Sequence, residues 1–189
     1  MKNLVEPLKD KKQIEAVEKY LEIRNKRNRL IWAFGCNVGL RVSDILALNI
    51  EDVKDKNYIE IIEKKTKKHK GFPLNSKLKR LIKDYLDNDR CKVYAIGDVE
   101  PLFVGKKHHR LDRSQVYRFI NEACKELGIG ENVGTHTMRK NFGYHVFKQS
   151  GNNIALIQKL FQHSSPVVTL RYIGIDKEEI DKTYENFEL

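Results

Sequence analysis

Six polar residues between positions 41 and 172 are of the types that enzymes use to handle a phosphate group. They are Arg41, Lys65, His136, Arg139, His163 and Tyr172. His136 and Arg139 are three residues apart, a spacing that places both side chains on one face of a helix. A phosphodiester under in-line attack gathers charge on its non-bridging oxygens, and planar guanidinium groups meet two such oxygens with paired hydrogen bonds. The set therefore indicates phosphoryl-transfer chemistry.

Arg41 and Arg139 are the expected clamps on the phosphate. Arg41 follows Gly39 and Leu40 at the end of an apolar helical stretch. Losing one pre-organised donor of this kind costs about 3 kcal/mol of transition-state stabilisation, a rate factor of about a hundred or more. Taken alone, an arginine at this position is as often a surface salt-bridge partner. Its membership of the larger set favours the clamp.

Tyr172 is the expected nucleophile. A phenol has an ordinary pKa of about 10 and must lose its proton as it attacks, so nearby cations and an acceptor such as His136 would assist it. The alternative is an ordinary amphipathic core tyrosine, which is the commoner role of any single tyrosine. Tyr144 is a second candidate by residue type, but its phase on its helix suits packing.

Five segments resemble the catalytic domain of tyrosine recombinases, the phage integrase family. The resemblance runs from about Leu8 to Gly174, through GLRVSDILALNIEDV, EKKTKKHKGFPL, HTMRKNFGYHVF, LFQHSS and TLRYIG. It implies an α+β fold: a mostly helical DNA breaking-rejoining catalytic domain with a small antiparallel β-sheet on one side. It also implies cleavage and rejoining of DNA through a 3′-phosphotyrosyl intermediate, with no ATP, metal or other cofactor.

The resemblance implies roles for three further residues. Lys65, in the Lys-Thr pair before a hairpin turn, matches the general acid that protonates the leaving 5′-oxygen. His163 matches a histidine that donates to the scissile phosphate, although Gln162 replaces the glycine common before it. Asp44 matches an acid that supports the active-site residues from behind, and its alternative is a solvent-exposed helix charge.

The neighbouring lysines leave the assignment of the general acid open. Lys64, Lys67, Lys68 and Lys70 compete with Lys65. A lysine run is usually a solvated face that attracts phosphates, so these four are also the expected DNA-binding residues.

Composition agrees with a DNA-binding enzyme. The 189 residues include 36 Lys and Arg against 26 Asp and Glu, which gives a net charge of +10 and a pI of about 9.4 and favours a polyanionic partner over a merely basic surface. Three irregularly spaced cysteines argue against a disulfide framework and for a reducing cytosol. Neither a signal peptide nor a membrane span is apparent, so we expect a cytoplasmic protein. The spacings of metal sites and of Gly-rich phosphate loops are absent.

Periodicity and capping residues predict a chain of helices around one hairpin. Asp10 and Gln13 suggest a capping box that opens the first helix, and Tyr58 to Glu63 is β-branched enough to be a strand. A hairpin follows from Thr66 to Lys70, and residues 91–111 read as loop. The remaining expected helices are 28–38, a short one after Arg41, one beginning near Asn75, 114–127, 137–149, 153–161, 167–172 and 177–187.

The chain is expected to be one catalytic domain over residues 1–189, without the separate N-terminal core-binding domain of full-length relatives, and hence a weak, salt-sensitive DNA binder. By the resemblance, residues 175–189, with Ile180, Tyr184 and Phe187, form a tail helix that contacts a neighbour in a DNA-bound tetramer of otherwise monomeric protein.

The expected function is site-specific recombination or integration for a mobile element such as a prophage, on double-stranded DNA, with accessory DNA-bending proteins as further partners. The alternatives are a type IB topoisomerase-like relaxase and an inactive DNA-binding regulator that retains the fold.

Overall fold

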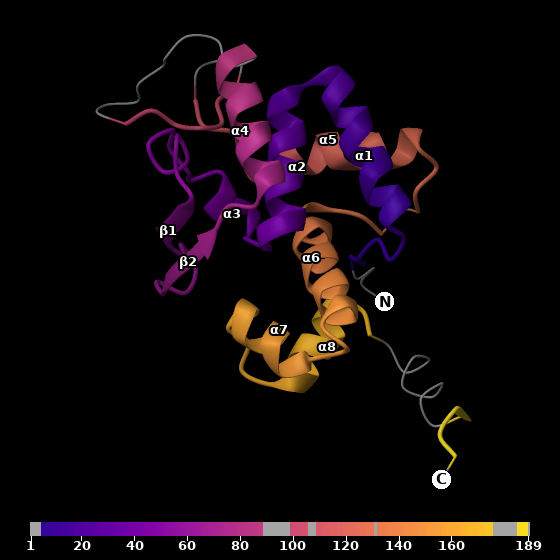
Figure 1. Cartoon of the computed structure of the whole chain (residues 1–189). Helices are drawn as coiled ribbons and strands as arrows, with labels where there is room; N and C mark the ends of the chain where they lie inside the picture. Colours follow the sequence, from indigo (N-terminus) through magenta and orange to yellow (C-terminus); the bar gives the residue numbers. More distant parts are fainter. Residues whose placement is uncertain (1–4, 89–98, 106–108, 131, 176–184, 189) are drawn as a thin grey trace.

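The computed structural model describes residues 5–88, 99–105, 109–130, 132–175 and 185–188. Its elements are α1 (Lys11–Arg24), α2 (Lys26–Val38), α3 (Val42–Ile45), β1 (Tyr58–Ile62), β2 (His69–Pro73), α4 (Ser76–Asn88), α5 (Arg113–Glu126), α6 (Thr135–Gln149), α7 (Ile154–Phe161) and α8 (Pro166–Ile173). Helices α1, α2, α4 and α5 gather at one end, and α6 leads from them to α7 and α8 at the other (Figure 1). This arrangement confirms the α+β class.

Helix α2 is the centre of the larger group. Its residues from Leu30 to Phe34 are at most 1% exposed, and it packs against α1, α4 and α6. A helix that is apolar around most of its circumference must be covered on several sides. It ends at Gly39, whose φ of +62° is the left-handed conformation that terminates helices. The apolar stretch before Arg41 is therefore what fixes the position of that arginine.

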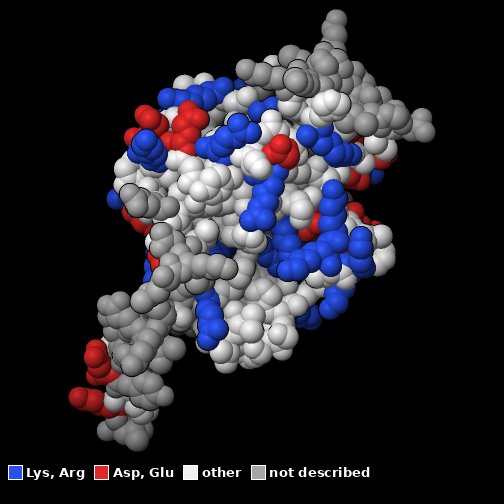
Figure 2. Space-filling model, turned by 180° about the vertical axis from the view of Figure 1, so that it is seen from behind, with Lys and Arg blue, Asp and Glu red and all other residues white. Residues whose placement is uncertain are grey.

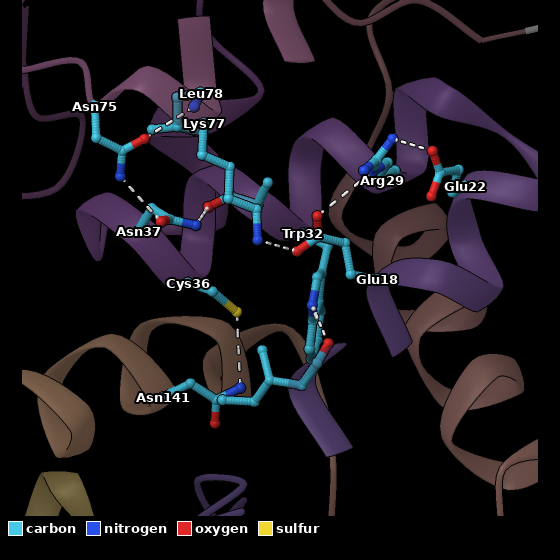
Figure 3. A network of polar contacts seen from close by, with 12 residues as sticks. Glu18, Glu22, Arg29, Trp32, Cys36, Asn37, Asn75, Lys77, Leu78 and Asn141 are labelled. Carbon is cyan, nitrogen blue, oxygen red and sulfur yellow. Dashed lines mark hydrogen bonds and ion pairs between the residues drawn. The ribbon is translucent and has the colours of Figure 1, made fainter. Parts of the chain in front are cut away.

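A buried ionic contact joins three helices of this group (Figure 3). Glu18 on α1 is 8% exposed, and its carboxylate lies 2.6 Å from Nζ of Lys77 on α4 and 3.5 Å from Nε of Arg29 on α2. Trp32 of α2 donates its indole N–H to the carbonyl of Ile14. Because the mostly buried Glu18 carboxylate needs close cationic partners, these contacts link α1 to both α2 and α4.

The β-hairpin is two-stranded and antiparallel, with Ile59 opposite Phe72 and Ile62 opposite His69. Ile59 and Phe72 are buried on one face, as the period of two requires. Lys67 takes a φ of +57° in the connecting turn. The hairpin lies at one side of the molecule, next to α3 (Figure 1), as the sequence predicts.

Helices α6, α7 and α8 share a second, smaller core of Tyr144, Phe147, Ile157, Phe161 and Ile173. Gly143 makes the close approach possible, because a Cβ there would lie 2.6 Å from the Phe161 ring and 2.7 Å from Ile173. This packing brings the segment after α7 and the whole of α8 onto the helix that carries the His-x-x-Arg pair.

Most predicted elements are present, with shifted ends. Asp10 does cap α1, but its carboxylate accepts from the backbone N–H of Lys12, so the expected capping box with Gln13 is wrong. The capping box occurs instead on α5, between Asp112 and Gln115. Residues 177–184 of the expected terminal helix and Cys91 lie outside the described residues. Within the described ranges, no helix is both long and apolar enough to cross a membrane.

Candidate active site

Arg139 is the most firmly held of the predicted site residues. It lies on α6 and is 2% exposed. Its Nη1 donates to the carbonyl of Gly39 at 2.5 Å, its Nη2 donates to the carbonyl of Phe161 at 3.2 Å, and its guanidinium stacks 4.3 Å from the Phe161 ring centroid. These contacts join the ends of α2 and α7 to α6, so the guanidinium is rigidly placed.

Arg41 reaches the same place from the N-terminus of α3. Its Nη1 donates to Oε2 of Glu63 at 2.7 Å, and Oε1 of Glu63 lies 4.0 Å from Nη1 of Arg139. The structure therefore brings both expected clamps to one carboxylate. Two guanidiniums this close repel each other unless an anion lies between them, which is an arrangement suited to a phosphate.

Glu63 is not among the residues predicted from the sequence; it directly follows β1 and is 1% exposed. Burial opposes ionisation of its carboxyl, but the hydrogen bonds from Thr66 and Arg41 outweigh burial and hold its pKa below the ordinary value. The signal available in the sequence is a single acid directly before the lysine run, and only the fold shows that this acid points inward.

Tyr172 lies close to both His136 and His163. Its Oη is 3.4 Å from Nδ1 of His136, and its ring centroid is 5.1 Å from that of His163 and 5.5 Å from that of Phe161. Burial raises the pKa of the phenol, and the Arg139 and Arg41 charges oppose that rise. Tyr144, by contrast, is packed in the second core and is 9% exposed.

His163 is oriented by a buried threonine. Nδ1 of His163 lies 3.2 Å from Oγ1 of Thr169, and the Thr169 hydroxyl also donates to the carbonyl of Ser165 at 3.0 Å. Because the hydroxyl has one proton, this network assigns the imidazole proton to Nδ1 and leaves a lone pair on Nε2. A donation from Nε2 to a phosphate oxygen then requires the imidazolium form.

Both histidines have pKa values below the ordinary 6.5. Burial is the main cause at each, reinforced at His136 by Arg113 and at His163 by Arg139. Near neutral pH both rings are therefore mainly neutral. A neutral His136 has a lone pair available for a phenol proton, and the charge of an approaching phosphate would favour protonation of His163.

Gln162 takes the left-handed conformation, with φ +56° and ψ +39°, as the residue that ends α7. Only glycine adopts this conformation without steric cost, which is the physical reason for a glycine before the histidine. The imidazole nevertheless stays in the site.

The hairpin lysines divide into two groups. Lys64, Lys65, Lys67 and Lys68 are exposed in or beside the turn. Lys70, on β2, is partly buried and donates from Nζ to the carbonyl of Leu160 at 3.2 Å. Burial and the Arg139 charge lower the pKa of Lys70 to about 8. Lys70, which competes with Lys65 for the role of general acid, is thus the hairpin lysine that lies near the arginines.

Asp44 supports the hairpin from α3. It is 3% exposed, so the exposed alternative is wrong for this side chain. Its Oδ1 accepts from the backbone N–H of Lys64 at 2.9 Å, and its buried Oδ2 has no hydrogen-bond partner in the described part of the chain.

Lys and Arg side chains form a band across the face shown in Figure 2, densest at the side on which the hairpin lies. The exposed lysines of the hairpin turn are Lys64, Lys65, Lys67 and Lys68. Within the described ranges, no group of three or more His, Cys, Asp or Glu side chains is arranged to hold a metal ion.

The chain is similar to several known proteins. It is 37% identical over 185 residues to the probable integrase/recombinase YoeC of Bacillus subtilis (strain 168), covering 98% of both chains. It is 30% identical over 163 residues to tyrosine recombinase XerC of Thermodesulfovibrio yellowstonii, covering 85% of this chain and 54% of the relative. The chain thus spans about half the length of that relative.

Its fold is similar to that in the crystal structure of XerA recombinase, with a TM-score of 0.78 and 22% identity over 98% of this chain and 65% of the other. The model of the phage integrase family matches residues 9–179. With that match over most of its length, the chain belongs to the phage integrase family.

Proposed function

We propose that this chain cleaves and rejoins double-stranded DNA through a 3′-phosphotyrosyl bond to Tyr172. The observation that carries the proposal is the convergence of the Tyr172 phenol and His136 with two guanidiniums that meet at one carboxylate. A phenol beside a neutral imidazole and a pair of arginines is equipped to attack a phosphodiester.

In the cleavage step, Oη of Tyr172 attacks the phosphorus while His136 Nδ1 takes the phenol proton. The Oη–P bond forms and the P–O5′ bond breaks. Arg41 and Arg139 stabilise the charge on the non-bridging oxygens, joined by His163 in its imidazolium form. The phosphodiester is exchanged for a phosphotyrosyl ester of similar energy, so a free 5′-hydroxyl can reverse the step without ATP.

The leaving 5′-oxygen needs a proton, and the hairpin supplies the donor. The family resemblance supports Lys65 as this donor. Lys65 lies on an exposed turn, from which it would have to reach the leaving 5′-oxygen. Lys70 is the alternative favoured by position and by its lowered pKa of about 8, which suits a general acid near neutral pH. Lys64, Lys67 and Lys68 then serve as phosphate contacts that position the DNA.

The expected biological outcome is site-specific recombination by protomers assembled on DNA in the cytoplasm. The free thiols of Cys36 and Cys124 fit a reducing compartment. Accessory DNA-bending proteins are further expected partners. A topoisomerase-like relaxase would use the same chemistry, and a paired-site assay in parallel with a supercoil-relaxation assay separates the two activities.

Trapping of the covalent species tests the proposed chemistry. A pool of nicked duplexes, randomised around the nick, lets the short 5′-hydroxyl fragment diffuse away and leaves protein attached to DNA. We expect an adduct with wild type and Tyr144→Phe, and none with Tyr172→Phe. An adduct that persists in Tyr172→Phe would refute the assignment, and DNA binding without any adduct would favour the regulator.

A substrate with a 5′-bridging sulfur identifies the acid, because its leaving group needs no proton. Cleavage of this substrate should be restored in the variant that lacks the true donor. Lys65→Ala, Lys67→Ala and Lys70→Ala are the three arms. Rescue of Lys70→Ala alone would overturn the Lys65 assignment, and rescue of Lys67→Ala alone would overturn both.

A further inference from the structure

Glu63 connects three parts of the candidate active site through one side chain. Its Oε2 accepts from Nη1 of Arg41 at 2.7 Å and from Oγ1 of Thr66 at 2.6 Å, while Oε1 faces Nη1 of Arg139 at 4.0 Å. Thr66 directly follows Lys65 in the hairpin turn. One carboxylate therefore lies between the two guanidiniums and is bonded to the turn that carries the expected general acid.

The surroundings of this carboxylate are predominantly cationic. The side chain of Arg139 is 3% exposed and that of Arg41 is 19% exposed, so water screens their mutual repulsion poorly. Lys70 adds a third positive charge nearby. Asp44 is a second acid that acts on Arg139, but its Oδ1 accepts a hydrogen bond from the backbone N–H of Lys64. Glu63 is thus the carboxylate that directly balances the pair of arginines.

Hydrogen bonding at one edge also restricts the Arg41 guanidinium. A guanidinium has five N–H donors in a planar fork, and an anchor at Nη1 leaves the other donors in a defined direction. Glu63 is itself fixed by the hairpin, because its backbone N–H donates to the carbonyl of Lys68 at 3.0 Å and its carbonyl accepts from Lys67 at 2.9 Å. The anchor is therefore part of a rigid element.

We propose that Glu63 is a positioning residue, which holds Arg41 beside Arg139 for the scissile phosphate and ties the Lys65 turn to the same point. This inference rests on the proposed DNA cleavage. Glu63 does not touch the substrate in this scheme. It works by keeping the donors pre-organised before the phosphate arrives, which is where a small misplacement is costly.

The role predicts opposite effects on binding and on chemistry. Glu63→Gln keeps the size of the side chain but removes its negative charge, so the site becomes more cationic and DNA binding should be unchanged or tighter. Arg41 loses its charge-assisted anchor, so cleavage at saturating DNA should slow by about 10- to 100-fold. A general loss of structure would weaken both properties together.

Single-turnover cleavage of the trapped-nick substrate and DNA binding in the Tyr172→Phe background measure the two effects. Glu60→Gln is the matched control, because Glu60 lies exposed on β1, three residues before Glu63, and the substitution changes the net charge equally. We expect Glu60→Gln to cleave like wild type. In an Arg41→Ala background, Glu63→Gln should lower the cleavage rate by less than about a further threefold, because Glu63 acts by positioning Arg41.

Several outcomes would overturn the positioning role. One is cleavage by Glu63→Gln within twofold of Glu60→Gln, and another is a parallel loss of binding and cleavage. If Glu63→Gln does not fold, Thr66→Val removes one donor from the carboxylate and keeps its charge. A fall in its cleavage rate of about threefold or more supports the role, and an unchanged rate overturns it.

Adduct formation by the wild-type protein distinguishes a failure of this inference from a failure of the proposed function. An adduct in wild type with no effect of Glu63→Gln removes the role of Glu63 alone. Absence of a Tyr172-dependent adduct in wild type removes the proposed function and the role of Glu63 together.

Discussion

Replacing Gln162 by glycine should stabilise the protein. Gln162 has φ +56° and ψ +39°, a conformation that costs a non-glycine residue about 1–2 kcal/mol. Its buried Oε1 also has no hydrogen-bond partner in the described part of the chain, which adds about 1 kcal/mol. Glycine gains more freedom in the unfolded chain, an opposing effect of about 0.5–1 kcal/mol. The net expectation is a gain of at least about 1 kcal/mol in the free energy of unfolding.

Urea unfolding and thermal melting measure this gain, and for a chain of this size about 1 kcal/mol corresponds to a rise of about 2–4 °C in Tm. Gln149→Gly is the control, because Gln149 is the exposed last residue of α6. Glycine at this helical position should lower the free energy of unfolding by about 0.5–1 kcal/mol. Cleavage should be unaffected, since Thr169 holds the neighbouring imidazole. If Gln162→Gly destabilises the protein as much as the control does, the conformational argument is wrong.

Three other perturbations test the site. Gly39→Ala should lower the free energy of unfolding by at least about 2 kcal/mol in urea, because φ is +62° and a Cβ would lie 2.3 Å from the Phe142 ring; a neutral result would contradict the close packing. Thr169→Val should slow cleavage by about tenfold and change the pH profile of cleavage, because the Thr169 hydroxyl fixes the His163 tautomer. Thr169→Ser keeps the hydroxyl, so its cleavage rate and pH profile should match those of wild type. Equal behaviour of the two variants would count against this role. The free energy of unfolding should fall as the pH drops below 6.5, the ordinary histidine pKa. His136 and His163 have lower pKa values in the folded protein, so in this range the unfolded chain binds more protons than the folded one. Urea unfolding at pH 7.5 and 5.5 measures the drop, which should shrink when both histidines are replaced by glutamine; an undiminished drop would place its origin elsewhere.

Much of the local structure could be predicted because its causes lie within a few residues. The helix before Gly39, the hairpin at Thr66 to Lys70 and the helix that begins near Asn75 follow from periodicity, turn residues and side-chain caps. The candidate residues could also be named from their types and motif spacing. The boundaries shifted where several caps compete, as at Asn25, which caps α2 three residues before the predicted start.

The sequence alone determined which residue types were available for phosphate chemistry, since motif, spacing and charge are properties of the chain. Only the tertiary structure decided which of them meet. Arg139 bonds to Gly39 across 100 residues, and a single buried carboxylate from the hairpin comes to lie between Arg139 and Arg41. The inward position of Glu63, and of Lys70 ahead of Lys65, depends on packing between distant elements. Burial and neighbouring charge also set the pKa values in the site, and both arise only when the chain is folded.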